Sequence, residues 1–347
     1  MATPQEKIRV ALNGYGVIGK RVADAVACQD DMELVGVADI DTGWRMRTAA
    51  QKGFTLFASL EDRVGAMRDA GLQVAGTLHD LLGDAEVVVD CTPKPIGAHN
   101  AEHYREHGVK FIVQGGEKHE VTGHSFVAEA SYASTVGRQA TRVVSCNTTS
   151  IVRTLTALKQ AGLLKKARGT VMRRATDPWE SHKGGIMNTL VPEDEIPSHQ
   201  APDAQTVDAE LDVVTIAVKV PETIAHLHSW SVQLTRKAST EEVIDAFRAS
   251  SRIALIHMGD GLTALNTVKE LMADLGRPRD NLYEVALWED LVAVRDDEAF
   301  YAYMVDNQAI VIPETIDAIR ALTSREHDPN VSMTKTNTAL GIGPKLI

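Results

Sequence analysis

One cysteine of this chain occupies a position that suits a nucleophile. Cys146 follows a β-branched run, residues 142–145, and precedes a polar cluster, residues 147–150. Apolar residues then recur at helical spacing, so the pattern predicts a strand leading into a helix whose first turn holds Cys146. The unpaired N–H groups and the dipole of a helix N-terminus favour the thiolate, the nucleophilic form of cysteine. A free cysteine is more often an inert apolar residue, and these residues alone leave both interpretations open.

Two histidines further along the chain are candidate bases for that cysteine. His226 and His228 lie two residues apart in a strand-like run, so they face the same side of a sheet. Histidine has an ordinary pKa of about 6.5, which suits a general base near neutrality. The chain has 12 histidines, and a core or surface position is the alternative for either of these two.

Two adjacent arginines are candidate ligands for an anion. Arg173 and Arg174 are neighbours in a strand-like run. Consecutive strand residues point to opposite faces, so at most one of them should meet a ligand from a given face. A planar guanidinium matches a phosphate through two parallel hydrogen bonds. A pair of surface cations is the alternative.

Three glycines near the N-terminus form a dinucleotide-binding pattern. Gly14, Gly16 and Gly19 have the G-x-G-x-x-G spacing between a predicted strand and a predicted helix. A second predicted strand, residues 33–38, leads to Asp39. A carboxylate at this position binds the ribose hydroxyls of adenosine and repels a 2′-phosphate, so we expect NAD, with NADP disfavoured. The alternative for Asp39 is a solvated carboxylate at a strand end.

The order of the predicted elements divides the chain. Alternating strands and helices up to residue 144 predict a Rossmann-type parallel sheet, with Thr92 and Gly116 in loops that follow strands. Beyond the Cys146 helix, strands of alternating pattern predict an antiparallel sheet with helices on one side, an α+β domain. We therefore expect a dinucleotide-binding domain at 1–144, a catalytic domain at 145–306, and C-terminal helices at 307–347 that return to the first domain.

Composition excludes several classes of protein. The 347 residues are 44% hydrophobic and 24% charged, as in a soluble globular protein of about two domains. No run approaches the about 18 apolar residues of a membrane span, and the polar N-terminus has no signal-peptide core. Three cysteines without paired spacing disfavour a disulfide framework or a zinc site, so we expect a cytoplasmic protein without a metal. The net charge of −11 disfavours nucleic acid, although local cations still permit a phosphorylated small molecule.

Short collinear segments that span nearly the whole chain carry a family resemblance. They are Asn13-Gly14-Tyr15-Gly16, Asp90-Cys91-Thr92-Pro93, Gln114-Gly115-Gly116-Glu117-Lys118-His119-Glu120, Val144-Ser145-Cys146-Asn147-Thr148-Thr149, Ser198-His199 with Pro202-Asp203, His226-x-His228 and Lys335-Thr336-Asn337. The chain resembles the archaeal-type (type II) glyceraldehyde-3-phosphate dehydrogenases in these segments. The Gly-Gly-Glu-Lys-His and Ser-Cys-Asn-Thr-Thr segments are specific, whereas the glycine triplet is generic.

The resemblance implies a glycolytic oxidoreductase that converts glyceraldehyde 3-phosphate to an acyl phosphate through a cysteine thioester. Cys146 would be the nucleophile, His226 rather than His228 the base, and the assembly a homotetramer. The residues expected to bind NAD or NADP are Gly14, Gly16, Val17, Ile18, Gly19, Asp39, Thr92, Gly116, Arg174 and Asn307. Those expected to bind the phosphorylated aldehyde and inorganic phosphate are Ser145, Asn147, Thr148, Arg174, His199, Gln200 and Ala201.

Departures from the family pattern concern the ligands. Asp39 stands where the family often has a Lys or Thr suited to NADP, and Gln200 replaces a histidine of the Ser-His-His-Gly-Pro-Asp motif. Residues 178–184 also differ, with Trp179 introduced and one residue added. These changes leave open a related dehydrogenase for another phosphorylated or phosphonylated aldehyde, or one that hydrolyses the thioester. A non-catalytic NAD-binding regulator is a further alternative, which the nucleophile, base and cation set disfavours.

Overall fold

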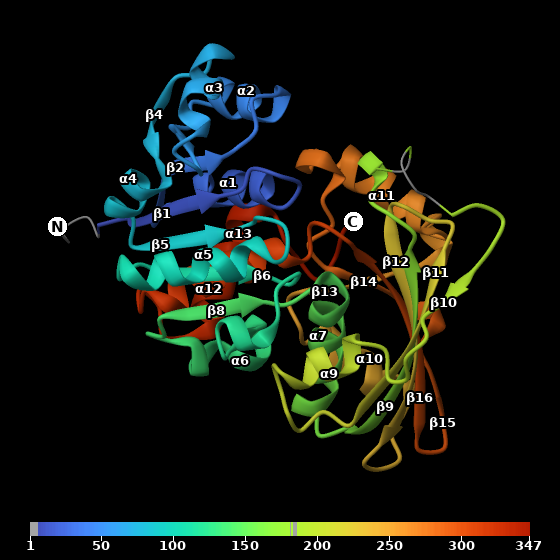
Figure 1. Cartoon of the computed structure of the whole chain (residues 1–347). Coiled ribbons are helices and arrows are strands. Elements are labelled where there is room, and N and C mark those ends of the chain that lie inside the picture. Colours follow the sequence, from blue (N-terminus) through green and yellow to red (C-terminus); the bar gives the residue numbers. More distant parts are fainter. Residues whose placement is uncertain (1–5, 181, 183–185) are drawn as a thin grey trace. The chain divides into compact units, whose positions relative to one another are not determined.

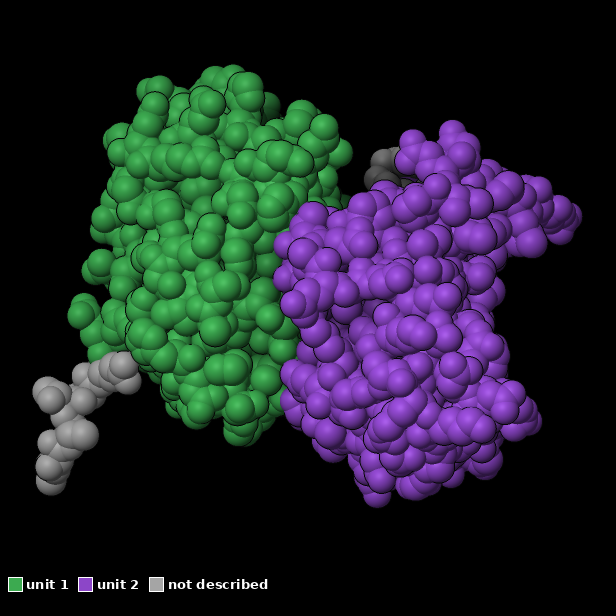
Figure 2. All heavy atoms as spheres, turned by 90° about the horizontal axis from the view of Figure 1, so that it is seen from below, with its two compact units in different colours: residues 1–144, 312–341 green, residues 145–311, 342–347 purple. Residues whose placement is uncertain are grey.

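The chain folds into two compact units, which Figure 2 distinguishes by colour. The computed structural model describes residues 6–180, 182 and 186–347, so three residues of the divergent segment, Ser181, Lys183 and Gly184, lie outside the described residues. Unit 1 comprises residues 1–144 and 312–341, and unit 2 comprises residues 145–311 and 342–347. The chain thus leaves unit 1 just before Ser145. The C-terminal segment expected at 307–347 is shared, since its first five and last six residues belong to unit 2.

Unit 1 contains the predicted Rossmann-type sheet, in which every neighbouring pair of described strands is parallel (Figure 1). The strands follow the order β4-β3-β2-β1-β5-β6-β8-β7. Their bounds are β1 Ile8–Asn13, β2 Met32–Asp39, β3 Leu56–Ala58, β4 Val74–Thr77, β5 Val87–Asp90, β6 Lys110–Gln114, β7 Ser125–Phe126 and β8 Ala140–Val143. The connections reverse direction between β1 and β5, and a sheet of this kind binds ligands at the carboxyl ends of the strands beside that reversal.

Two short strands of unit 1, β4 and β7, were not predicted. The sequence around Gly76 indicates a turn, but the structure places this glycine in β4. A Cβ at Gly76 would lie 2.5 Å from Asp80 Oδ2, and Asp80 accepts the N–H of Thr77 to begin the next helix. Glycine at this position lets the Asp80 carboxylate lie close to the strand backbone. In the sequence alone, a glycine with this role looks the same as a glycine that marks a turn.

The helices of unit 1 include two from the C-terminal part of the chain. Arg320 is fully buried, and its Nε and one terminal nitrogen each donate to the Asp31 carboxylate at 2.8 Å. The same guanidinium donates to Thr336 at 2.6 Å, so one cation joins both C-terminal helices to the loop before β2. The helices are α1 Gly19–Ala27, α2 Trp44–Gln51, α3 Arg63–Asp69, α4 Leu78–Gly83, α5 Ile96–Glu106, α6 Ala128–Thr135, α12 Val311–Leu322 and α13 Pro329–Leu340.

Unit 2 is built on a sheet that is largely antiparallel, as expected, and contains two parallel pairs. The order is β10-β11-β9-β12-β16-β14-β13, with β15 on β16, and the parallel pairs are β9 with β11 and β13 with β14. The strands are β9 Leu164–Arg174, β10 Val191–Pro192, β11 Val213–Val220, β12 Ala225–Leu234, β13 Ile253–Ile256, β14 Val285–Trp288, β15 Ala293–Arg295 and β16 Glu298–Asp306. Residues 175–212 connect β9 to β11, and this length permits the crossover that a parallel pair requires.

One face of this sheet lies against α7, Cys146–Gln160. His226, His228 and Trp230 alternate along β12, and hydrogen bonds join Asn147 and Ser150 of α7 to the His228–Tyr303 pair on this face. A Cβ at Gly169, the register partner of Trp230 on β9, would lie 2.7 Å from the indole. The other α-helices among the described residues of this unit are α9 Gln200–Gln205, α10 Thr240–Arg248 and α11 Leu265–Asp274.

The last residues of the chain pack within unit 2. Leu346 is buried in a cluster with Trp288 and Met304, and the N–H of Gly343 donates to Glu284 at 3.2 Å. This burial explains why the end of the chain does not remain with α13. Within the described part of the chain, no helix combines the length and apolar character needed to cross a membrane.

Candidate active site

The structure brings Cys146 and His226 together from positions 80 residues apart in sequence. Cys146 is the first residue of α7, and its Sγ lies 3.4 Å from His226 Nε2 on β12. Ser145 caps the helix, with its hydroxyl oxygen accepting the N–H of Thr148 at 3.3 Å. The predicted strand-to-helix junction thus places a thiol in the first helical turn beside an imidazole.

Burial changes the expected state of the thiol. Burial raises the pKa of Cys146 above its ordinary value of 9.0, and the opposing effects of Arg174, the Asn147 N–H and Arg173 do not cancel it. Burial away from water penalises the charged form, so it opposes the preference for the thiolate that is expected from the helix N-terminus. The thiol must lose its proton to become a thiolate, and the positive charges of Arg174 and Arg173 favour that loss.

The hydrogen bonds of His226 decide which nitrogen carries its proton. The backbone N–H of Arg174 donates to His226 Nδ1 at 3.0 Å. Burial, followed by the charge of Arg174, holds the pKa of His226 well below 6.5, so the ring is neutral and its single proton is on Nε2. That proton faces the sulfur. The general base expected from sequence requires the other tautomer, in which Nδ1–H would oppose the Arg174 N–H.

Both arginines lower the pKa of the thiol, a charge effect that does not require the two guanidinium groups to lie on the same face of the sheet. Arg174 lowers the pKa of Cys146 more than Arg173 does. Arg174 ends β9, so strand alternation no longer constrains its guanidinium. One nitrogen of Arg174 lies 3.1 Å from Asp177, and Arg173 pairs with Glu193.

Asn307, expected at the cofactor, lies beside one of these arginines. In the amide orientation that satisfies both ends, its oxygen accepts from Arg174 Nε and its nitrogen donates to the Ile224 carbonyl at 2.9 Å. Asn307 therefore orients the guanidinium and is itself largely buried.

The substrate-binding candidates fall into two groups. Thr148 lies in the first turn of α7 and donates to Asp203 at 2.6 Å, and its hydroxyl is 2.8 Å from that of Ser145. Gln200 and Ala201 are fully buried, because the short α9 packs against α7. Their side chains do not reach an accessible surface, so the expected contact with substrate is not supported for them.

His199, by contrast, is partly exposed and lies near a carboxylate side chain. Its Nδ1 lies 3.7 Å from Glu193, the carboxylate that also pairs with Arg173. Glu193 and Asp177 were not recognised from sequence, and Asp203 was noted only as part of a family-like segment, since nothing in their spacing marks them as partners of the arginines and of Thr148.

The glycine loop of unit 1 has the geometry that a dinucleotide requires. Gly14 has φ 94°, and a Cβ there would lie 2.9 Å from the Cys91 carbonyl carbon. A Cβ at Gly19 would collide with the Gly14 carbonyl oxygen, whereas one at Gly16 would meet no atom within 4 Å. Gly14 thus permits the tight turn, and Gly19 permits the close approach of the helix. Gly16 leaves accessible backbone, as pyrophosphate binding requires. Val17 and Ile18 complete this turn before α1.

Asp39 lies at the end of β2, as predicted, and organises the same loop. Its carboxylate accepts the N–H groups of Tyr15, Ile40 and Asp41 at 2.5, 2.7 and 2.9 Å. These bonds fix a negative charge at the strand end where an adenosine ribose would lie. Thr92 follows β5 and donates to Asp90 at 2.5 Å, and Gly116 lies in the loop after β6.

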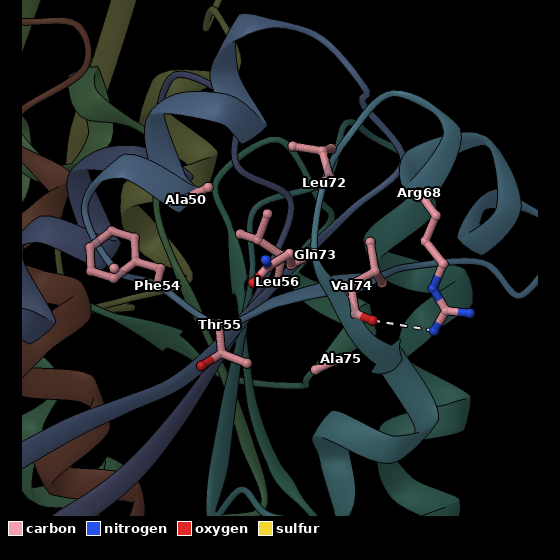
Figure 3. A pocket seen from close by; sticks show the side chains of 10 residues that line it. Ala50, Phe54, Thr55, Leu56, Arg68, Leu72, Gln73, Val74 and Ala75 are labelled. Carbon is pink, nitrogen blue, oxygen red and sulfur yellow. Dashed lines mark hydrogen bonds between the residues drawn. The ribbon is translucent and has the colours of Figure 1, made fainter.

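A cavity of 670 Å³ in unit 1 is not part of this arrangement (Figure 3). It lies at the amino-terminal ends of β3 and β4, where Arg68 donates to the Val74 carbonyl at 3.3 Å. Its lining residues are Ala50, Gly53, Phe54, Thr55, Leu56, Arg68, Leu72, Gln73, Val74 and Ala75, none of which is a candidate site residue. Ligands of such sheets bind at the opposite, carboxyl-terminal edge. Among the described residues, no group of three or more His, Cys, Asp or Glu side chains is arranged to hold a metal ion.

Comparison with known proteins relates both units to characterised families. Residues 145–275 match the model of the glyceraldehyde 3-phosphate dehydrogenase C-terminal domain, and residues 8–148 match that of the dihydrodipicolinate reductase N-terminus. Glyceraldehyde-3-phosphate dehydrogenase of Methanobrevibacter smithii is 44% identical over 96% of this chain and 99% of its own length. The enzymes of the same name from Methanothermus fervidus and Methanopyrus kandleri are 42% and 45% identical, each over 96% of this chain and over 98% and 97% of their own lengths.

Proposed function

Because the chain belongs to the glyceraldehyde-3-phosphate dehydrogenase family, we propose that it oxidises glyceraldehyde 3-phosphate to an acyl phosphate, with inorganic phosphate and preferably NAD. The family relationship makes the protein an oxidoreductase that uses a nicotinamide cofactor. The observation that carries the proposal is the 3.4 Å contact between Cys146 Sγ and His226 Nε2, with the cations of Arg173 and Arg174 acting on the same thiol.

Cys146 begins the reaction as the nucleophile. The thiol gives its proton to water, and the sulfur forms a bond to the aldehyde carbon while the carbonyl π electrons move to oxygen as an alkoxide. His226 presents its Nε2 proton to the sulfur and then to this oxygen. Donors fixed toward a developing negative charge stabilise it without reorganisation, so we propose that His226 and Asn147 serve as donors at this step.

The second stage transfers the acyl group to phosphate. Loss of a hydride from the alkoxide carbon, for which a bound nicotinamide cofactor would be the acceptor, leaves the acyl group as a thioester on Cys146. An inorganic phosphate oxygen attacks the thioester carbon, the carbon–sulfur bond breaks, and the thiolate leaves. We propose that Arg174 holds the anionic oxygens, because a guanidinium binds them in two parallel hydrogen bonds. Asp177, 3.1 Å from Arg174, must release this guanidinium when phosphate binds. The thiolate that leaves is stabilised by the same two arginines.

The residues of the glycine loop fit the cofactor that the family uses. We propose that the backbone of Gly14, Gly16 and Gly19 and the N-terminus of α1 hold its pyrophosphate, and that Asp39 binds the adenosine ribose. When bound, the cofactor accepts hydride at its nicotinamide ring. The charge of Asp39 would repel a 2′-phosphate, which supports NAD over NADP.

The proposal predicts fast reduction of NAD by glyceraldehyde 3-phosphate that depends on inorganic phosphate. The measurement is NADH absorbance with and without phosphate, repeated with NADP. We expect kcat/KM for NAD to exceed that for NADP by about tenfold, the effect of about 1.4 kcal/mol of repulsion at Asp39. Asp39→Asn keeps the side-chain size and removes the charge, so it should bring the ratio of kcat/KM for NAD to kcat/KM for NADP closer to one. A ratio unchanged by the substitution would show that Asp39 does not set the preference.

The raised pKa of Cys146 leads to a second prediction. Alkylation by iodoacetamide should accelerate as the pH rises beyond 9.0, because less than half of this thiol is ionised below its raised pKa. Arg174→Gln should shift the profile to higher pH, since Arg174 lowers the thiol pKa more than any other neighbour. Labelling in Cys146→Ser gives the background from Cys28 and Cys91. Maximal labelling already below neutrality would mean that the thiolate is the resting form.

A dehydrogenase for a different anionic aldehyde is the second candidate. Trp179 is 53% exposed in the segment that departs from the family pattern, and Gln200 is buried where the family has a histidine. Turnover of another phosphorylated or phosphonylated aldehyde, with little for glyceraldehyde 3-phosphate, would establish it. A non-catalytic regulator is disfavoured, since a binding module has no need of the Cys146–His226 pair.

We also propose a homotetramer in the cytoplasm. Large apolar side chains are exposed between β9 and β11, with Met187 84%, Leu190 62% and Ile196 69% accessible. Such side chains are typical of interfaces between subunits. The three free cysteines support a reducing compartment. Light scattering of the purified protein tests the assembly, and a monomer at working concentration would reject it.

A further inference from the structure

A chain of hydrogen bonds leads through the core of unit 2 to the residue that follows the thiol. Trp230 Nε1 donates to the Tyr303 hydroxyl oxygen at 3.2 Å. That hydroxyl lies 2.9 Å from His228 Nδ1, and His228 Nε2 lies 2.9 Å from Asn147 Oδ1. None of the four side chains, together called the Asn147 relay, is more than 4% exposed. Buried polar groups arranged in this way hold one another in fixed positions.

The first member of the relay fixes the direction of one hydrogen bond, and the contact distances indicate the next. An indole N–H can only donate, so Tyr303 accepts from Trp230 and has its own proton to give. His228 Nδ1 at 2.9 Å is nearer than the Ser150 hydroxyl at 3.3 Å, which itself donates to the Asn147 carbonyl at 2.8 Å. We infer that Tyr303 donates to His228 Nδ1, the nearer of these two acceptors.

The second half of the relay follows from the neutrality of His228. Burial lowers the pKa of His228 to about 3, so the ring carries one proton. With Nδ1 accepting from Tyr303, that proton is on Nε2 and is donated to Asn147 Oδ1. The oxygen of the Asn147 carboxamide is thus occupied, and its other end is an NH₂ group, which can only donate.

We propose that the Asn147 relay reserves the Nδ2–H₂ group of Asn147 as a donor to the oxyanion that forms when Cys146 attacks a carbonyl carbon. This inference rests on the proposed function in taking Cys146 as the nucleophile. Asn147 adjoins Cys146 in the first turn of α7, and its backbone N–H already interacts with the thiol. His228, Tyr303 and Trp230 are positioning residues, because each acts through Asn147.

Two reactions of Cys146 separate this role from mere support of the fold. Alkylation by iodoacetamide displaces iodide from carbon and forms no oxyanion. Acylation by p-nitrophenyl acetate adds the thiolate to a carbonyl, passes through an oxyanion, and then breaks the ester bond to release p-nitrophenolate. Both require the thiolate, and neither requires the cofactor or the natural aldehyde. The ratio of the two rates therefore reports stabilisation of the oxyanion alone.

The test compares two tyrosines of one strand. Tyr303→Phe removes only the hydroxyl of the relay. Tyr301→Phe is the matched control, because Tyr301 is equally buried on β16, its ring is 6.2 Å from that of Tyr303, and among the described residues its hydroxyl makes no direct hydrogen bond to a member of the relay. We expect Tyr303→Phe to lower the acylation-to-alkylation ratio by about tenfold, and Asn147→Ala by about 10²–10³-fold, the usual loss for one oxyanion donor. Tyr301→Phe should leave the ratio at the wild-type value.

Substitution of His228 gives an independent measurement should Tyr303→Phe fail to fold. His228→Gln retains a nitrogen donor at a similar reach, so its acylation-to-alkylation ratio should stay near the wild-type value. His228→Leu has no donor, so its ratio should fall as far as that of Asn147→Ala. Equal losses in both reactions, or the same loss in Tyr301→Phe, would overturn the relay. A wild-type protein with the expected ratios that fails to oxidise glyceraldehyde 3-phosphate would instead overturn the proposed substrate and leave the relay intact.

Discussion

Replacement of Cys146 by serine should abolish phosphate-dependent oxidation and leave the affinity for NAD nearly unchanged. Serine keeps the size of the residue and the N-terminal turn of α7, including its cap at Ser145. The hydroxyl is far less acidic than a thiol, and no adjacent base is available because His226 Nε2 already carries a proton. We expect kcat to fall by at least about 10⁴-fold, as for other nucleophile substitutions. Steady-state kinetics and NAD titration by fluorescence measure the two quantities.

The control for this prediction is the exposed cysteine of unit 1. Cys28 lies at the end of α1, and Cys28→Ser should leave turnover at the wild-type level. Loss of NAD binding in Cys146→Ser, in parallel with loss of turnover, would make Cys146 a structural residue.

Replacement of His226 by asparagine should lower kcat by about 10²–10⁴-fold, the range for a lost oxyanion donor or proton-transfer group. The imidazole connects the Arg174 backbone to the sulfur through its two nitrogens, and the shorter asparagine side chain cannot span both contacts. Because His226 is 3% exposed, the melting temperature must be measured beside kcat. His257→Asn, on the surface of unit 2, should change neither.

The pH dependence of the wild-type enzyme distinguishes the two roles of His226. Its pKa lies well below 6.5, so the ring stays neutral and keeps its Nε2 proton through the neutral range. If His226 is a donor, kcat/KM should rise with pH until the raised thiol pKa is passed. A rise that ends near pH 6.5 would instead report an ordinary imidazole acting as the base.

The parallel unit could be predicted almost completely, and its exceptions have local causes. Alternating strands and helices, the glycine spacing and Asp39 predicted the parallel sheet and the strand ends at which these residues lie, because these signals are short-range. The strand β4 was missed since Gly76 is needed against Asp80, a contact that looks like a turn signal. The parallel pairs β9–β11 and β13–β14 were not foreseen either, because strand pairing depends on contacts between distant residues.

The members of the candidate site could be predicted more readily than their chemical states. The spacing of His226 and His228 places both on the face that α7 covers, and Trp230 continues the same alternation, so the period itself was a usable signal. The raised thiol pKa and the tautomer of His226 could not be predicted. Both depend on burial and on the Arg174 N–H, which comes from 52 residues away.

The most direct test of the covalent mechanism is the intact mass of the protein after one turnover without phosphate. The protein is mixed with NAD and glyceraldehyde 3-phosphate, quenched in acid, and analysed by mass spectrometry with peptide mapping. We predict one acyl group per chain as a thioester on Cys146, formed together with one NADH and removed when inorganic phosphate is added before the quench. NADH formation without an adduct on Cys146, or an adduct on another residue, would contradict catalysis through this cysteine.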